Sequence, residues 1–163
     1  NPIFFSYPFG EYSSLIKEHI SKNFKFSFGQ HSGVIDINKD PYELPRFPIN
    51  EKYGDLKRFE TLIKTLPFKY KNILPAQKYL TPPNNPPVVK IEFFDNAKNI
   101  DKINCYSNEG DVWRKSEINF INESNIEIKL KEKFLGERGR INCSLREDGG
   151  FWRWLGIQFV IAN

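Results

Sequence analysis

The periodicity of the apolar residues changes once along this chain, at a run rich in proline. Before residue 70 they occur in short blocks and at helical spacing, a pattern typical of alternating strands and helices. After residue 87 they alternate with polar residues, as in strands that bury one face. The run Thr81-Pro82-Pro83-Asn84-Asn85-Pro86-Pro87 contains no core-forming residue. We therefore predict an α/β unit at 1–70, a linker at 71–87 and an all-β unit at 88–163.

The first unit is predicted to hold two or three strands and two helices. A buried-type strand at 3–5 is followed by a helix over 13–23 and a strand at 24–28. A second helix begins near Asp55 and is stopped by Pro67. Its apolar stripe comprises Leu56, Phe59, Leu62, Ile63 and Leu66. Parallel strands need neighbours and cover on both faces, which so few elements cannot supply, so we expect the unit to complete a larger sheet or barrel.

The second unit is predicted to be a β-sandwich of about seven short strands, the number typical of an immunoglobulin-like domain. Its apolar residues recur with a period of two in six segments, and a further strand is expected at Trp113. The alternating residues are Val89, Ile91 and Phe93; Ile103 and Cys105; Ile118 and Phe120; Ile126, Ile128 and Leu130; Ile141, Cys143 and Leu145; and Ile157, Phe159 and Ile161.

The two cysteines fall on the inward phase of their predicted strands. Cys105, Trp113 and Cys143 follow one another in the order typical of a sandwich whose sheets are joined by a disulfide. A bond between cysteines 38 positions apart would contribute roughly 3 to 4 kcal/mol. It would also place the protein in an oxidising compartment, periplasmic or secreted. The alternative is two free buried cysteines in a cytosolic protein.

Charge and hydropathy argue against two classes of partner. The chain has 24 basic and 20 acidic residues, interspersed, so no basic stripe for nucleic acid is predicted. No apolar stretch approaches the roughly 20 residues of a membrane-spanning helix. The sequence has no methionine and opens at Asn1 ahead of an apolar run, so we expect that a segment upstream is missing.

Three motifs in the first unit and two in the second resemble those of one enzyme family. The first three are Phe5-Ser6-Tyr7-Pro8-Phe9-Gly10-Glu11-Tyr12, Phe28-Gly29-Gln30-His31-Ser32-Gly33 and Leu44-Pro45-Arg46-Phe47-Pro48. They are similar to the last third of NodB-type polysaccharide deacetylases, carbohydrate esterase family 4. Asn142-Cys143 and Trp152-Arg153-Trp154-Leu155-Gly156-Ile157-Gln158-Phe159 resemble the accessory β-domain of envelope members of that family.

The resemblance implies a fold and a chemistry. Residues 1–70 would be the closing βα units of a distorted (β/α)7 barrel, incomplete here. The reaction would be hydrolysis of N-acetyl groups on an envelope or extracellular polysaccharide by water that a divalent metal, zinc for instance, activates. The family's Asp and His ligands lie nearer the N-terminus, outside this chain. The chain alone is therefore expected to be inactive and to need the missing N-terminal part as its partner.

The resemblance also assigns roles to the turn at Tyr7, Pro8 and Phe9. In the family this turn forms a wall of the substrate site, and the backbone N–H at the position of Phe9 helps to hold the oxyanion. The family pattern is Arg-x-Pro-Tyr, whereas this chain has Ser6 and Phe9 at the outer positions. Only the backbone role of Phe9 therefore transfers directly. The alternative is a plain turn between a strand and a helix.

His31 and Arg46 are the remaining candidates for catalysis. An imidazole titrates near neutrality, so His31 is a candidate general acid for the leaving amine. The family's acid belongs to a Leu-x-His motif, and this chain has Leu44-Pro45-Arg46 there. Arg46 could orient an acidic group or bind acetate. The alternatives are a solvated loop histidine and an arginine in a salt bridge at the barrel rim.

Two tryptophans near the C-terminus are candidates for substrate binding. Trp152 and Trp154 could stack on sugar rings, or they could share one face of a strand that packs into the sandwich or against the barrel. They also motivate a second class of function, a non-catalytic module that binds a glycan or a protein.

Overall fold

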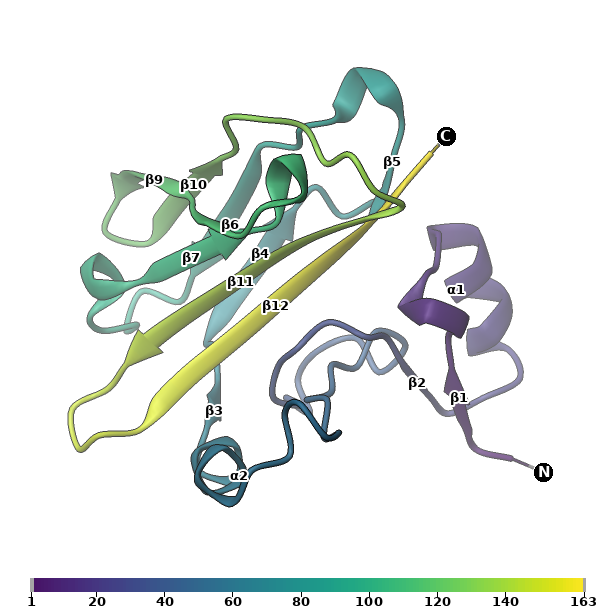
Figure 1. Ribbon diagram of the computed structural model, residues 1–163, viewed down its shortest axis with the longest axis horizontal. Coiled ribbons are helices and arrows are strands. Elements are labelled where there is room, and N and C mark those ends of the chain that lie inside the picture. The colour runs from purple at the N-terminus through teal and green to yellow at the C-terminus, as the bar shows by residue number, and fades with distance from the viewer. Residues whose placement is uncertain (1, 163) are drawn as a thin grey trace.

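The computed structural model describes residues 2–162 and is rich in β-structure, with two α-helices (Figure 1). The helices are α1 (Ser14–Ser21) and α2 (Leu56–Ile63). The strands are β1 (Phe4–Ser6), β2 (Phe26–Phe28), β3 (Leu66–Pro67), β4 (Tyr70–Leu74), β5 (Tyr79–Leu80), β6 (Val89–Phe93), β7 (Asn104–Ser107), β8 (Arg114–Lys115), β9 (Glu117–Asn122), β10 (Asn125–Lys129), β11 (Arg138–Arg146) and β12 (Trp152–Ile161). None of the helices in this part of the chain is long and apolar enough to cross a membrane.

Two open sheets form the larger part of the structure. One has the order β4-β6-β10-β9, and the other has the order β3-β12-β11-β7-β8 with β5 also paired to β12. Most of the residues predicted to alternate inward are buried between the sheets, among them Val89, Ile126 and Ile141, each 0% exposed. Phe120 is an exception, because it lies opposite the buried Ile126 but on the edge strand β9, where it is 46% exposed. The period-two pattern therefore predicted the core correctly.

The predicted linker at 71–87 is part of the sheets. It contains most of β4 and all of β5, and with β3 these strands raise the number in the two sheets to ten in place of about seven. The proline run is itself fixed, because the Asn85 side chain donates to Phe134 O and accepts from Phe134 N, both at 2.9 Å. Prolines exclude a helix but leave short flanking segments free to pair with the sheets.

The predicted disulfide is present, but it lies within one sheet. Cys105 of β7 and Cys143 of β11 are bonded and face each other directly on neighbouring antiparallel strands. Both point into the core and are 0% exposed. Trp113 precedes β8 in an irregular segment and is half exposed. The expectation of a bond between the sheets beside a buried tryptophan is therefore wrong, because the order of residues does not specify which strands pair.

The first unit is a small parallel assembly with its own packing. β1 pairs with β2 in parallel, and Leu44 bridges to Phe28 in parallel. Tyr7, Tyr12 and Ile20 are buried together. Both predicted helices are present and are capped by Ser13 and Asp55, whose side chains accept from Ile16 N and Arg58 N.

Much of the apolar surface of the first unit is uncovered. The apolar stripe of α2 was expected to be buried. Leu56, Phe59 and Ile63 are nevertheless exposed, because none of the elements within residues 2–162 covers them. The exposed apolar side chains of this unit include Ile3, Phe4, Leu15, Ile16, Phe26, Leu56, Phe59 and Ile63. A closed (β/α)7 barrel is not formed by residues 2–162, which supply only β1, β2 and the bridge at Leu44 on this side.

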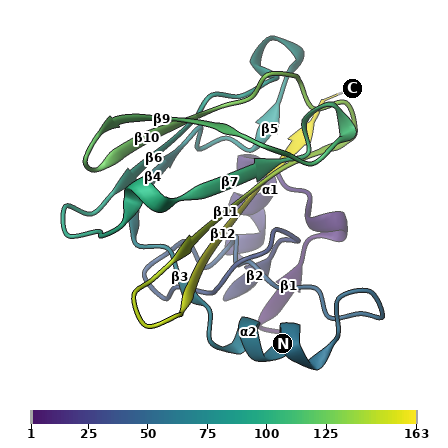
Figure 2. The ribbon, with the colours of Figure 1, turned by 60° about the vertical axis from the view of Figure 1, so that its left-hand side comes forward.

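The outward face of β12 joins the two units, and both ribbon views place this strand between the sandwich and the first unit (Figures 1 and 2). Gln158 Nε2 donates to Gly10 O at 3.0 Å and to Phe9 O at 3.3 Å. Gly156 lies against the backbone of Ser32, where a Cβ atom would collide. Trp154 packs edge-on to Phe47 with ring centroids 6.0 Å apart.

Reduction of the disulfide should destabilise the protein. Closing a loop of 38 residues gives an entropic stabilisation of roughly 3 to 4 kcal/mol. Urea unfolding with and without dithiothreitol measures it, and the midpoint should fall in reductant. The matched control is the double variant C105A/C143A, in which reductant should change nothing. An identical wild-type midpoint under both conditions would contradict the expectation.

Replacing Gly156→Ala should loosen the contact between the units. The added methyl group would meet the Ser32 carbonyl, and overpacking of this kind costs about 1–3 kcal/mol. We expect a lower Tm and faster proteolytic cleavage within 29–48. Gly136→Ala is the control, because its nearest neighbour there, Asp111 Oδ1, is 3.5 Å away. Equal cleavage rates in the two variants would refute a tight contact at Gly156.

Candidate functional site

Three parallel segments of the first unit, namely β1, β2 and the segment at Leu44, end side by side. Tyr7 N donates to Phe28 O at 3.0 Å, Gly29 N donates to Leu44 O at 2.9 Å, and Arg46 N donates to His31 O at 3.1 Å. The loops that follow these segments therefore begin at one edge. Ligands of open α/β sheets bind outside the carboxyl ends of the strands, so this edge is the candidate functional site. The backbones of the predicted positions His31 and Arg46 are bonded here, and Phe9 lies in the turn after the first segment, but the side chains of Phe9 and His31 line different cavities.

Phe9 occupies a strained turn that leaves its amide available. Its φ of 55° lies in the left-handed region, which is uncommon for a residue with a side chain. The turn is held by bonds from Gly10 N to Tyr7 O at 2.9 Å and from Glu11 N to Pro8 O at 3.0 Å. Among residues 2–162 the Phe9 N–H has no hydrogen-bond acceptor. The turn therefore presents one unpaired donor beside an exposed aromatic ring.

Tyr7 and Pro8, predicted with Phe9 as substrate contacts, differ in exposure. Tyr7 is 1% exposed, and its hydroxyl donates to Tyr42 O at 3.0 Å while accepting from Ser27 Oγ at 3.0 Å. Its hydroxyl is thus committed within the protein. Pro8 is exposed and lines a shallow apolar cavity of about 500 Å³ together with Phe9.

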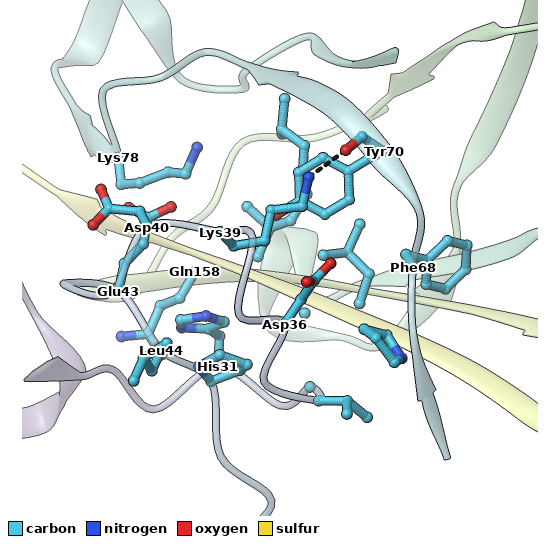
Figure 3. Close-up of a pocket in the computed structure, with 18 of the residues that line it drawn as sticks. His31, Asp36, Lys39, Asp40, Glu43, Leu44, Phe68, Tyr70, Lys78 and Gln158 are labelled. Carbon is cyan, nitrogen blue, oxygen red and sulfur yellow. Dashed lines mark hydrogen bonds between the residues drawn. The ribbon is translucent and has the colours of Figure 1, made fainter. Parts of the chain in front are cut away.

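A second, more polar cavity of about 260 Å³ lies between the loop that carries His31 and the strands β4 and β12 (Figure 3). Lys17 Nζ, from α1, binds Asp40 at 2.7 Å and Glu43 at 2.9 Å. The Tyr12 hydroxyl donates to the same Glu43 carboxylate at 3.3 Å. Across the cavity, Lys78 Nζ donates to Pro75 O at 2.7 Å.

Burial dominates the electrostatics of this cavity. It lowers the pKa of His31 to about 4, with a smaller lowering by Lys78 and an opposing effect of the Glu43 carboxylate and carbonyl. Burial also lowers the pKa of Lys78, against the attraction of Glu43. The imidazole of His31 is therefore neutral at pH 7 and can accept a proton. While its pKa stays this low, His31 cannot act as a general acid at neutral pH.

Of the other predicted site residues, Trp154 lines the cavity of His31, whereas Arg46 and Trp152 lie outside it. Arg46 is exposed and forms no ion pair with any residue in the range 2–162. Trp154 is held against Phe47, and its buried Nε1 has no partner among the described residues. Trp152 lies six residues from Gln158 along β12 and is partly exposed near the hairpin. Trp152 and Trp154 therefore share the face of β12 that is turned toward the first unit, as in the alternative in which they lie on one face of a strand.

Several polar residues of the site have no local sequence signal. Lys17 comes from α1, Asp40 and Glu43 from the loop after β2, and Lys78 from the segment before β5, and only the fold brings them together. Gln158, which holds the Phe9 turn, is one polar residue in an apolar strand. Within residues 2–162 no group of three or more His, Cys, Asp or Glu side chains is placed to hold a metal ion.

Comparisons with family models, with curated proteins and with solved structures found no match to this chain.

Acidification should destabilise the protein through His31. The unfolded imidazole titrates near 6.5 and the folded one near 4, so the unfolded state binds more protons between these pH values. The stabilisation is present above pH 6.5 and is lost as the pH falls toward 4. We expect the drop in Tm from pH 7 to pH 4.5 to be smaller in His31→Gln than in the wild type. His19→Gln, at the other and exposed histidine, should keep the full drop; the opposite ranking would show that His31 is not buried neutral.

Proposed function

We propose that this chain is part of a metal-dependent polysaccharide deacetylase that removes N-acetyl groups from an envelope or extracellular glycan. The observation that supports the proposal most directly is the unpaired Phe9 amide at the edge where three parallel segments end beside His31 and Arg46. The Cys105–Cys143 disulfide is compatible with an extracellular or periplasmic location.

The divalent metal of such an enzyme does not fit the residues of this chain, because no ligand cluster is formed among residues 2–162. In the proposal its ligands belong to a further segment of the protein. The uncovered apolar side chains of β1, α1 and α2 support such a segment, because parallel strands and helices of α/β folds are normally covered on both sides.

The chain's own contribution is to position groups around the acetyl group. The Phe9 N–H would donate to the oxygen that becomes negatively charged as water attacks the carbonyl carbon. The carbonyl in the same peptide unit as this N–H is that of Pro8, which accepts from Glu11 N at 3.0 Å, and Gln158 holds the carbonyls of Phe9 and Gly10 next to it. The exposed Arg46 guanidinium would bind a carboxylate, either a neighbouring acidic residue or the acetate product.

His31 is the proposed donor of a proton to the leaving amine. Its folded pKa of about 4 is too low for this role at neutral pH unless a carboxylate raises it. Glu43 already acts in that direction. Docking of a further segment with additional acidic groups would act in the same sense.

Acetate release tests the proposal. Protein that includes the segment preceding residue 1 should, with zinc, release acetate from N-acetylglucosamine oligomers, and residues 1–163 alone should not. Loss of a general acid costs about 10²–10⁴-fold in rate, so His31→Gln should lower kcat within that range while His19→Gln should not. No acetate release from any N-acetylated oligomer by the longer protein would overturn the proposal.

The alternative is a non-catalytic module that binds a glycan or a protein. The half-exposed aromatic residues Phe151 and Trp152 at the β11–β12 hairpin favour it. Trp152-dependent binding by a longer protein that releases no acetate would identify this class.

A further inference from the structure

A groove separate from the site above lies between α2 and the β11–β12 hairpin. It encloses about 580 Å³. Phe151 and Trp152 form its aromatic side, and they are 46% and 37% exposed. The polar side is formed by Lys57, Glu60, Thr61 and Lys64.

The aromatic side is held rigidly. Gly149 and Gly150 turn the hairpin with φ of 92° and 86°, values that side chains disfavour. Glu147 N donates to Phe151 O at 2.8 Å and closes the turn. Arg153, next to Trp152 in β12, pairs with Glu147 and also donates to Pro67 O in β3, the strand that follows α2. One arginine therefore links the hairpin to the end of the helix.

The polar side is a single face of α2. Residues 57, 60, 61 and 64 are spaced at i, i+3, i+4 and i+7, so their side chains line the same side of the helix. Among residues 2–162, neither the two lysines nor Glu60 forms an ion pair. Their hydrogen-bonding groups are free to meet a ligand that carries both donors and acceptors.

An aromatic side opposite a polar helix face suits a polysaccharide better than a peptide or a polyanion. A pyranose has an apolar face that stacks on an aromatic ring and a rim of hydroxyl groups that suits polar side chains. A peptide strand would need an open sheet edge, but here β12 is paired with β3, whose two residues, Leu66 and Pro67, leave only a short edge to extend. A polyanion would meet Glu60 between the two lysines.

We propose that the groove between α2 and the β11–β12 hairpin binds an N-acetylated polysaccharide, with Trp152 as the stacking platform. Trp152 and Gln158 are six residues apart on the same face of β12, which is about 20 Å along a strand. Gln158 holds the Phe9 turn. The groove would therefore bind a part of the polymer remote from the acetyl group that reacts. The identity of the glycan rests on the proposed function, whereas the site itself does not.

Calorimetric titration of the full chain with the N-acetylglucosamine hexamer tests this proposal. We expect saturable binding that is at least tenfold weaker in Trp152→Ala and weaker in Phe151→Ala. Trp113→Ala is the matched control, because Trp113 is also an exposed tryptophan but does not line the groove, and it should bind as the wild type does. Tm values measured alongside would separate loss of the site from loss of the fold.

The proposal is overturned if the hexamer shows no saturable binding, or if a folded Trp152→Ala variant binds it as tightly as the wild type. Trp152-dependent capture of another protein without glycan binding would also overturn it, in favour of a protein contact. Because the titration needs neither metal nor acetate release, it can succeed or fail independently of the deacetylation test.

Discussion

The packing of one strand, β12, on both of its faces joins the sandwich to the first unit and positions the Phe9 turn. Its inward residues, such as Ile157 and Phe159, are buried in the sandwich core. Its outward residues contact the first unit, since Gln158 binds the Phe9 turn and Gly156 fits against Ser32. The close approach depends on the missing side chain of glycine, because a Cβ there would collide with backbone. Without this contact, the loops of a small parallel sheet would have little to hold them.

Burial at this interface changes what its ionisable groups can do. Lys17 pairs with both Asp40 and Glu43, so its single positive charge offsets part of the repulsion between the two carboxylates. His31 has only partial electrostatic support and remains neutral because the loss of water outweighs the attraction of Glu43. At neutral pH the group of this edge that is free to donate is therefore the Phe9 amide, which is the group to which the proposed function assigns the developing negative charge.

The aromatic residues of the β11–β12 hairpin are placed by the same strand. Trp154 packs against Phe47, while Trp152, two residues earlier on the same face, faces α2 across the groove and stays partly exposed. β12 contacts the Phe9 turn at one end and faces the polar side of α2 at the other, so under the proposed function an extended polymer would reach both. This arrangement would give an accessory sandwich a role in substrate placement.

Local patterns in the sequence determined the helices, the alternating core and the existence of the disulfide. Ser13 and Asp55 cap their helices, and the inward phase of β6 and β11 is set by alternation, because these effects depend on neighbours in the chain. Only the tertiary structure decided that β4 and β5 join the sheets, that Cys105 and Cys143 lie on adjacent strands, and that His31 lines a cavity with β4 and β12. Strand pairing and burial depend on contacts between residues far apart in sequence, and neither spacing nor composition specifies those contacts.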